Sequence, residues 1–420
     1  MKNINASIIT IGDELLIGQV IDTNSAWMAQ QLNRIGITVT KRIAVGDDAG
    51  QIRNALDTEK NIADIVLITG GLGPTSDDIT KQLLCKYFSG KMIVDNGALN
   101  NVKFLFEKVY HKPISDVIYK QAEVPDVCEV VQNKRGSAPG MIFQKDGTIF
   151  ISMPGVPYEM QGIMVDVILY LEKRFTLPTI IHKTILTAGI GESSLAEIIK
   201  NLEEQLPEEI RLAYLPSYGM VRLRLSISGF NKIKTEKLIN EKFNELKKLV
   251  KDYIVTDEDE TMQRVLGKLL LKNKKTISTA ESCTGGAIAS LITSIPGSSA
   301  YFEGSIVSYS YDIKEKLLDV KKETLDKYGA VSEETVREML SGLLRKMKTD
   351  FGIAVSGIMG PDGGTPEKPV GTVWIAVGNK EKQVVQKLQQ RFERQKNIEV
   401  TALMALNMMR EFVLEILKDK

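Results

Sequence analysis

Short apolar runs alternate with helical patterns in the first third of the chain. This pattern predicts strands at residues 7–11, 39–45 and 65–69, and a helix at residues 24–33. Strands separated by helices form parallel βαβ units, and the ligands of such sheets sit in the loops beyond the carboxyl ends of the strands. The loops after these strands are therefore the first place to look for a site.

The pattern changes near residue 170, where a small α+β module is expected at residues 176–253. Its predicted elements are a strand at 183–188, a helix at 193–206, an alternating strand at 221–227 and a long helix after Asn231. The last helix carries many lysines, but Glu236, Glu241 and Glu245 lie between them. This mixture is typical of a solvated helix face rather than a phosphate-binding one.

A second alternation of strands and helices follows an acidic stretch at residues 256–261. It predicts strands at 276–280, 305–309, 351–356 and 371–377, and helices at 285–293, 332–347 and 398–417. A chain of 420 residues is too long for one hydrophobic core. We expect an α/β protein with two three-layer domains, residues 1–170 and 257–420, joined by the α+β module.

Charge and rare residues exclude several classes of function. The 54 Lys and Arg balance the 53 Asp and Glu, so no overall field draws the chain to nucleic acid or to an anionic membrane. No apolar run approaches the roughly 20 residues of a membrane span. The two histidines lie in no motif, which excludes a zinc site built on paired histidines and argues against a Ser-His-Asp triad. Three scattered cysteines indicate reduced thiols in a cytoplasmic protein.

The loop after the predicted strand at 65–69 reads Gly-Gly-Leu-Gly-Pro-Thr-Ser-Asp-Asp from residue 70 to residue 78. Gly70, Gly71 and Gly73 allow backbone N–H groups to approach a phosphate, although the loop is neither a P-loop nor a dinucleotide fingerprint. One alternative is a simple turn in which Asp77 or Asp78 caps the next helix. Two carboxylates exceed what a cap needs, so one is a candidate ligand for a divalent ion that bridges to phosphate.

The predicted strand at 276–280 runs into Glu-Ser-Cys-Thr-Gly-Gly at residues 281–286. Ser282 is the candidate nucleophile, with the amides of Thr284 and Gly285 expected to stabilise an oxyanion. Ser282 as a helix cap is the alternative. Cys283 is the rival nucleophile, but no histidine lies near it in the sequence, so we expect it to be a buried small residue.

A serine without histidine needs another base, and a desolvated neutral lysine can serve. Lys314 is the candidate, although one lysine among many is a weak signal. The glycine-rich loop at residues 356–364, which contains Gly360, suits phosphate or ribose contacts; a flexible surface turn is the alternative.

Together these loops resemble a known family. Residues 11–18, 22–24, 69–80 and 153–160 resemble the amino-terminal domain of the CinA family, which is itself similar to molybdopterin-binding MoaB-type domains. The carboxy-terminal CinA domain is matched by residues 280–286, 297–299, 309–314, 329–332 and 356–364. The resemblance covers nearly the whole chain.

The resemblance implies that the carboxy-terminal domain is a nicotinamide mononucleotide deamidase that needs no cofactor. It implies Ser282 as nucleophile and Lys314 as base, with Ser299 and Tyr309 in the same polar network. Substrate-binding residues would be Thr284, Gly285, Gly286 and Gly360. Relatives carry a Phe-x-Gly-x-Arg stretch whose arginine meets the substrate phosphate, whereas this chain reads Arg-Phe-Glu-Arg-Gln from residue 391, so Arg394 or Arg391 takes that role. Met359 stands where a small residue is usual.

The resemblance also implies that the amino-terminal domain hydrolyses the pyrophosphate of ADP-ribose. A divalent metal such as Mg²⁺ would bind at Asp77 and Asp78, and the phosphates would lie over Gly70, Gly71 and Gly73. The middle module would be KH-like, and the protein a homodimer.

Two rival functions remain. One is a pterin- or nucleotide-binding protein without catalysis, and the other is a nucleic-acid-associated protein linked to competence. A KH module that binds nucleic acid needs a Gly-x-x-Gly loop, and this module offers only Gly-Ile-Gly at residues 189–191. Nucleic-acid binding is therefore not expected.

Overall fold

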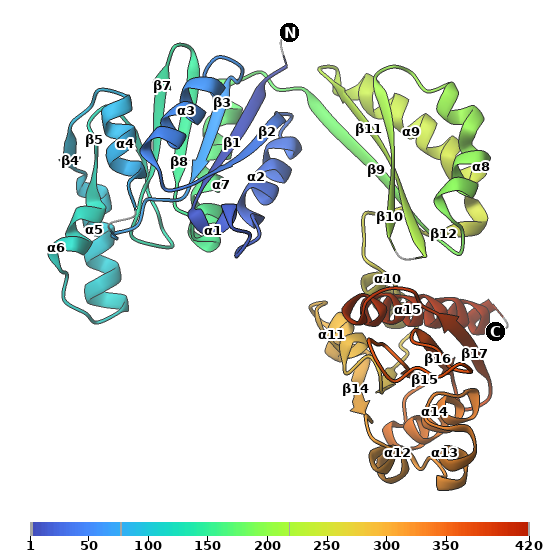
Figure 1. The fold of residues 1–420 in the computed structure, drawn as a ribbon. Helices are drawn as coiled ribbons and strands as arrows, with labels where there is room; N and C mark the ends of the chain where they lie inside the picture. The colour runs from blue at the N-terminus through green and yellow to red at the C-terminus, as the bar shows by residue number, and fades with distance from the viewer. Residues whose placement is uncertain (1–2, 76–77, 218, 419–420) are drawn as a thin grey trace. The chain divides into compact units, whose positions relative to one another are not determined.

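The structure is a computed structural model that describes residues 3–75, 78–217 and 219–418. The chain divides into two compact units, shown in Figure 1. The first contains Met1–Ile181 and Ile227–Leu238, and the second contains His182–Ser226 and Ile239–Lys420. Each unit is described separately below.

A six-stranded sheet forms the centre of the first unit. Its strand order is β2 (Thr38–Val45), β1 (Asn5–Ile11), β3 (Ile65–Thr69), β8 (Thr148–Met153), β7 (Gly140–Lys145) and β6 (Glu129–Val131). The first four strands are parallel, as the sequence predicted. β7 runs antiparallel to both neighbours. It is joined to β8 by Asp146 and Gly147, both at positive φ, and such a two-residue turn forms a hairpin.

Helices cover both faces of this sheet. They are α2 (Thr23–Arg34) and α7 (Pro157–Arg174) on one face, and α3 (Ala49–Glu59) and α4 (Thr80–Tyr87) on the other. Successive strand residues point to opposite faces, so Ile8 packs in one apolar cluster and Ile9 in the other. The predicted three-layer arrangement is confirmed here.

The rest of the first unit was not predicted from the sequence pattern. It consists of a short helix α1 (Asp13–Leu16) and a group of short elements: β4 (Met92–Val94), α5 (Asn96–Lys103), the π-helical turn η1 (Phe104–Val109), α6 (Asp116–Tyr119), η2 (Lys120–Ala122) and β5 (Glu123–Pro125). β4 and β5 pair antiparallel in a separate two-stranded sheet.

The α+β module forms a four-stranded sheet with the order β10 (Ile210–Ser217), β11 (Met220–Gly229), β9 (Thr179–Ala188) and β12 (Ile254–Thr256). Its helices are α8 (Glu192–Glu204), α9 (Lys232–Leu249) and the short turn η3 (Lys251–Tyr253). α8 buries Leu195, Ile199 and Leu202, which recur at helical spacing.

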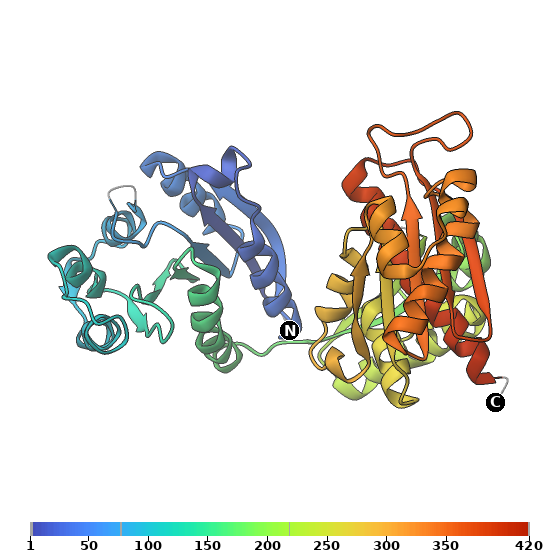
Figure 2. The same ribbon diagram turned by 90° about the horizontal axis from the view of Figure 1, so that it is seen from below.

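The last part of the second unit is a five-stranded sheet. Its order is β14 (Phe302–Val307), β13 (Ile277–Glu281), β15 (Phe351–Gly357), β16 (Thr372–Gly378) and β17 (Gln383–Gln389). β13 lies parallel between β14 and β15, while β16 and β17 are antiparallel. The loop between β15 and β16 protrudes from one end of the sheet (Figure 2).

Helices again lie on both faces of the sheet. They are α10 (Met262–Lys272), α11 (Ala287–Thr293), η4 (Ser298–Ala300), α12 (Tyr311–Leu318), α13 (Lys322–Tyr328), α14 (Glu333–Met347) and α15 (Arg394–Lys418). Ile353 and Val355 of β15 pack in the apolar cluster that includes α10 and α15, whereas Ala354 packs in the cluster that includes α14. The expected fold, two three-layer α/β domains and an α+β module, is confirmed.

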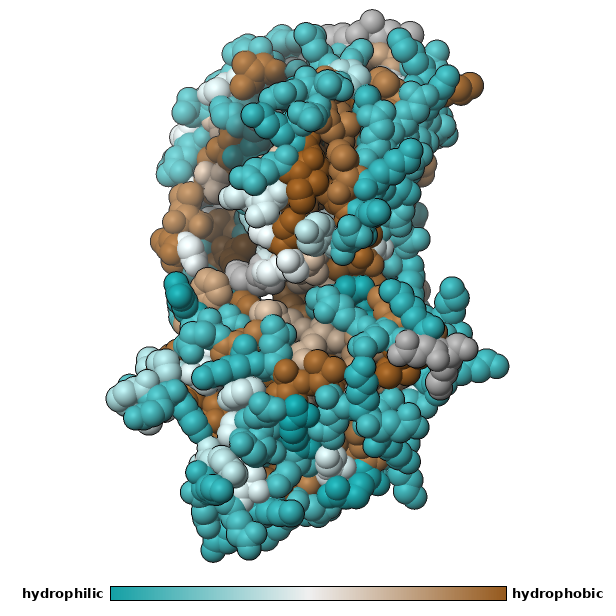
Figure 3. Space-filling model, turned by 90° about the vertical axis from the view of Figure 1, so that its right-hand side faces the viewer, coloured by the Kyte–Doolittle hydropathy of each residue, from teal (hydrophilic) through white to brown (hydrophobic). Residues whose placement is uncertain are grey.

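Within the described ranges, no helix is both long and apolar enough to cross a bilayer. Most of the face shown in Figure 3 is covered by hydrophilic residues.

Candidate active site

Ser282 and Lys314 come together at the carboxyl end of the last sheet. Ser282 follows β13 directly, and Lys314 lies on α12. The Lys314 Nζ lies 2.9 Å from the Ser282 Oγ. It also donates to the carbonyl oxygens of Ser308 at 2.6 Å and Tyr309 at 3.3 Å. These contacts hold the amine against the hydroxyl, in the geometry of a nucleophile and its base.

Burial changes the protonation of Lys314. Its side chain is 0% exposed, and within the described residues no carboxylate forms an ion pair with it. Desolvation therefore lowers the pKa of Lys314 to about 8. A substantial fraction of the amine is neutral in mildly alkaline solution and can accept a proton.

A cavity of about 200 Å³ opens beside this pair. Tyr309, Met359 and Arg394 are among the residues that line it. Arg394 begins α15 and donates to the Gly360 carbonyl at 2.8 Å and to the Tyr309 hydroxyl at 3.0 Å. The structure thus brings Ser282, Lys314, Tyr309, Gly360 and Arg394 to one place.

Two residues from the same prediction lie elsewhere. Ser299 is exposed in η4 and does not line the cavity. Its part in the polar network stays a prediction. Arg391 is also exposed and is not among the lining residues, so Arg394 is the arginine that faces the cavity.

The turn after Ser282 differs in detail from the expected oxyanion hole. The Gly285 amide donates to the Ser282 carbonyl at 3.1 Å, so the turn itself uses this group. The Gly286 amide donates to the Glu281 side chain at 3.1 Å. In the part of the chain that the structure describes, the N–H groups of Cys283 and Thr284 donate to no other residue. The available pair of amides is therefore Cys283 and Thr284 rather than Thr284 and Gly285.

Cys283 is buried beside the nucleophile. Burial raises the pKa of its thiol to about 12, so the thiol stays protonated at neutral pH. This supports its interpretation as a small packing residue.

Sequence reasoning missed Glu281 and Asn397, both fully buried. Asn397 donates to the carbonyls of Met359 at 3.0 Å and Phe392 at 2.8 Å, and so ties the cavity loop to the start of α15. For Glu281 the signal was a carboxylate placed just ahead of a helix start, which is a capping pattern.

In the first unit the glycine loop closes on the end of β3. The Gly70 amide donates to the Met153 carbonyl at 3.2 Å, and the Gly71 carbonyl accepts from the Thr80 amide at 3.2 Å. Gly71 has a φ of 63°, and a Cβ there would collide with the Thr80 side chain, so glycine is required.

Asp78 does not cap α4, which begins without a side-chain cap. Its carboxylate accepts instead from the Thr75 amide at 3.0 Å and from the Thr75 hydroxyl, inside the loop that contains Gly73. Asp77 lies outside the described residues. Among those that are described, no cluster of three or more His, Cys, Asp or Glu is arranged to hold a metal.

A cavity of about 120 Å³ lies at the carboxyl end of β1 and β3. Thr10, Asp22, Asn24 and Gly155 line it, and the Asn24 side-chain nitrogen donates to the Gly155 carbonyl at 2.7 Å. The Asn24 Oδ1 is buried and has no partner within the described chain. The four segments singled out in the sequence, residues 11–18, 22–24, 69–80 and 153–160, therefore meet at this cavity.

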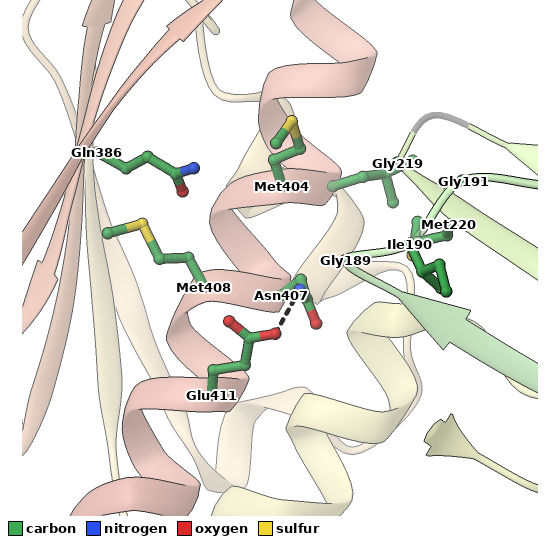
Figure 4. Close-up of a pocket in the computed structure, with 11 residues that line it drawn as sticks. Gly189, Ile190, Gly191, Gly219, Met220, Gln386, Met404, Asn407, Met408 and Glu411 are labelled. Carbon is green, nitrogen blue, oxygen red and sulfur yellow. Dashed lines mark hydrogen bonds between the residues drawn. The ribbon is translucent and has the colours of Figure 1, made fainter. Parts of the chain in front are cut away.

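A larger cavity, of about 390 Å³, lies elsewhere in the second unit (Figure 4). Met404, Met408 and Glu411 face it from α15, opposite the Gly189–Gly191 turn. It is lined by none of the predicted catalytic, substrate-binding or metal residues of the described chain.

Comparison with known families assigns three consecutive regions. Residues 7–173 match the probable molybdopterin binding domain. Residues 182–256 match the damage-inducible protein CinA KH domain, and residues 259–413 match the CinA C-terminal domain.

Two individual proteins and one solved structure are also similar to this chain. The CinA-like protein of Cytophaga hutchinsonii is 45% identical over 415 residues, 99% of each chain. The CinA-like protein of Flavobacterium psychrophilum is 50% identical over 374 residues, 89% of this chain and 90% of the relative. The crystal structure of the competence/damage inducible protein CihA from Agrobacterium tumefaciens is 34% identical, covers 37% of this chain and 98% of its own, and has a TM-score of 0.35. Since the relative from Cytophaga hutchinsonii is 45% identical over 99% of both chains, this chain belongs to the CinA family.

Proposed function

We propose that the Ser282 site is the active site of a nicotinamide mononucleotide amidohydrolase. The reaction converts nicotinamide mononucleotide and water to nicotinic acid mononucleotide and ammonia, a step of pyridine nucleotide salvage. One observation carries the proposal: a buried lysine with a depressed pKa lies 2.9 Å from a serine hydroxyl at the edge of a cavity. This pair suits amide hydrolysis without histidine, metal or cofactor.

In the proposed mechanism, Ser282 Oγ attacks the carboxamide carbon while neutral Lys314 takes the hydroxyl proton. The Cys283 and Thr284 amides stabilise the oxyanion. Lys314 then gives its proton to the leaving nitrogen, and ammonia departs as the acyl-serine forms. Lys314 next accepts a proton from water as the water attacks the ester, and it returns that proton to Ser282 when the acid leaves.

We assign binding of the substrate phosphate to Arg394. Its guanidinium lines the cavity, and the Gly360 carbonyl and Tyr309 hydroxyl fix its orientation. A planar guanidinium oriented in this way suits an anionic phosphate oxygen pair.

We further propose that the first unit hydrolyses the pyrophosphate of ADP-ribose. Support comes from the glycine loop at Gly70, Gly71 and Gly73 beside a cavity at the ends of parallel strands. The described residues fit a Mg²⁺ ion that arrives with the pyrophosphate rather than a resident ion. Mg²⁺ commonly takes one or two protein carboxylates plus substrate phosphates, and Asp78 offers such a carboxylate on this loop, next to Asp77. The ion would supply charge neutralisation of the phosphates.

The experiment is incubation of the purified protein with nicotinamide mononucleotide, or with ADP-ribose with and without Mg²⁺. Ammonia reports the first activity and AMP the second. Failure to release either product would leave the pterin- or nucleotide-binding alternative.

Nucleic-acid binding is not part of the proposal. A cytoplasmic location fits the three free cysteines of the described chain. A homodimer is proposed from the family resemblance and is tested by light scattering.

A further inference from the structure

The carboxylate of Glu281 lies at the centre of the turn that carries Ser282. Glu281 ends β13, and its side chain is 0% exposed. Its two oxygens accept four hydrogen bonds from the start of α11: from the Thr284 hydroxyl at 2.8 Å and from the N–H groups of Gly286 at 3.1 Å, Ile288 at 3.0 Å and Ala289 at 2.9 Å.

These partners fit two acceptor oxygens, which a glutamine amide does not offer. Backbone N–H groups only donate, so both oxygens of Glu281 must act as acceptors. The hydroxyls of Thr279 and Ser305 lie 3.1 Å and 3.4 Å from Oε1 and complete the shell. No basic side chain of the described chain forms an ion pair with Glu281, so the amides of the helix start stabilise its charge.

Both members of the reactive pair are anchored through this residue. The Glu281 side chain holds the turn that follows Ser282. The Glu281 carbonyl accepts from the Ser308 amide at 2.8 Å, and the Ser308 carbonyl accepts from Lys314 at 2.6 Å. Ser282 itself is fixed to β15 through its amide, which donates to the Val355 carbonyl at 3.0 Å.

We propose that Glu281 is the positioning residue of the Ser282–Lys314 pair. Its carboxylate fixes the turn so that the serine hydroxyl stays within hydrogen-bond distance of the lysine amine. Glu281 does not touch substrate and transfers no proton. This inference rests on the amidohydrolase function proposed above and adds a residue to its machinery.

The test compares Glu281→Gln with Glu303→Gln, a matched change of an exposed glutamate on the neighbouring strand β14. In Glu281→Gln the new amide N–H₂ group faces N–H donors, and the turn shifts. Displacement of a catalytic group by about 1 Å costs on the order of 100-fold in rate, so kcat should fall by about that factor while KM for nicotinamide mononucleotide stays the same. Glu303→Gln should match wild type in both constants.

A residue that only stabilises the helix start would behave differently. Folded Glu281→Gln, selected by its circular dichroism and thermal transition, would then keep the wild-type kcat, and this result would overturn the proposal. If Glu281→Gln does not fold, Thr284→Val carries the test, because it removes one hydroxyl donor and leaves the carboxylate and the amides in place. Its kcat should fall with KM unchanged, and a wild-type kcat would again overturn the proposal.

A second measurement separates this proposal from the proposed function. A fluorophosphonate probe reacts with an activated serine as an O–P bond forms and fluoride leaves, and intact mass reports the rate at Ser282. Glu281→Gln should slow this labelling by a factor similar to the loss in kcat, even if wild type hydrolyses no pyridine nucleotide. If Glu281→Gln were labelled at the wild-type rate, Glu281 would not position the pair, and this conclusion would hold for any natural substrate.

Discussion

The side-chain nitrogen of Lys314 lies 2.9 Å from the hydroxyl oxygen of Ser282, although 32 residues separate them in the chain. Two carbonyl oxygens orient the amine, and no charged partner neutralises it within the described residues. The pKa of Lys314 is therefore set mainly by burial, which lowers it to about 8 and makes the pair sensitive to pH.

The first prediction is that kcat/KM rises with pH and levels off above about 8. Only neutral Lys314 can accept the serine proton, and burial lowers its pKa to about 8. Below that pH the rate should rise about tenfold per pH unit. The pH–rate profile for nicotinamide mononucleotide measures this. A rate that falls across the same interval would contradict it.

Removal of the base Lys314 should lower the rate by roughly 100- to 10,000-fold, which is the usual contribution of a positioned proton acceptor. Lys314→Met tests this loss. Lys314→Arg should not restore activity, because a guanidinium stays protonated in proteins. Lys316→Met, an exposed lysine on the same helix, serves as the matched control and should keep wild-type activity.

The second prediction separates Ser282 from Cys283. Ser282→Ala should abolish deamidation, whereas Cys283→Ala should keep most of it, since the raised pKa leaves the thiol protonated. Steady-state ammonia release from both folded variants decides the matter. An inactive Cys283→Ala together with an active Ser282→Ala would mean that the enzyme uses a thiol.

The third prediction concerns recognition of the substrate phosphate. Arg394→Ala should raise KM for nicotinamide mononucleotide by roughly 10- to 100-fold, because hydrogen bonds to charged groups contribute about 1.5–3 kcal/mol. Arg391→Ala, outside the cavity, should change KM little. Nicotinamide riboside lacks the phosphate and is the matched substrate control. An equal loss of kcat/KM on the riboside would show that Arg394 supports the loop rather than the phosphate.

The fourth prediction is that the two proposed activities are separable. Asp77→Asn with Asp78→Asn should abolish Mg²⁺-dependent AMP release from ADP-ribose and leave deamidation within about threefold, because the two proposed sites belong to separate compact units that should act independently. Ser282→Ala should show the reverse. Parallel loss of both activities in a folded double variant would refute independent sites.

The fifth prediction links the site to stability. Unfolded Lys314 has a pKa near 10.5, above its folded value of about 8, so between these values the unfolded state binds more protons than the folded state. The free energy of unfolding of wild type should therefore increase with pH across this window relative to Lys314→Met. Urea unfolding at pH 7 and pH 10 measures the difference. If wild type and Lys314→Met differed in their free energy of unfolding by the same amount at pH 7 and at pH 10, Lys314 would not be desolvated.

Hydrophobic periodicity predicted the regular parts of the fold well. β3 and β15 lie within one residue of their predicted positions, because their residues are buried on both faces and the apolar run is unbroken. β17 was missed, since it is an edge strand whose exposed polar residues resemble a loop. The short elements between Met92 and Pro125 have too few buried residues for a period to show.

For the site, sequence reasoning singled out residues that the structure brings together, but not the residues that hold them in place. Ser282 stood out by its position after a predicted strand, whereas Lys314 was a weak signal that the family resemblance supported. Their contact depends on the parallel pairing of β13 with β14. Glu281 and Asn397 bind backbone groups, and only Glu281 has a sequence signal, the capping pattern noted above. The Gly285 amide donates inside the turn, and its expected part in an oxyanion hole stays a prediction.

Asn397 shows how this chain dispenses with a glycine before its arginine. Its side chain accepts from the Phe392 amide at 3.1 Å and donates to the Phe392 carbonyl at 2.8 Å. The Asn397 side-chain amide therefore pairs with both backbone polar groups of Phe392, as a residue of an adjacent strand would. The bend that orients Arg394 is thus held by a side chain three residues further along rather than by a flexible glycine two residues before the arginine. A motif search that insists on the glycine would overlook this arginine, and one that follows the buried asparagine would find it.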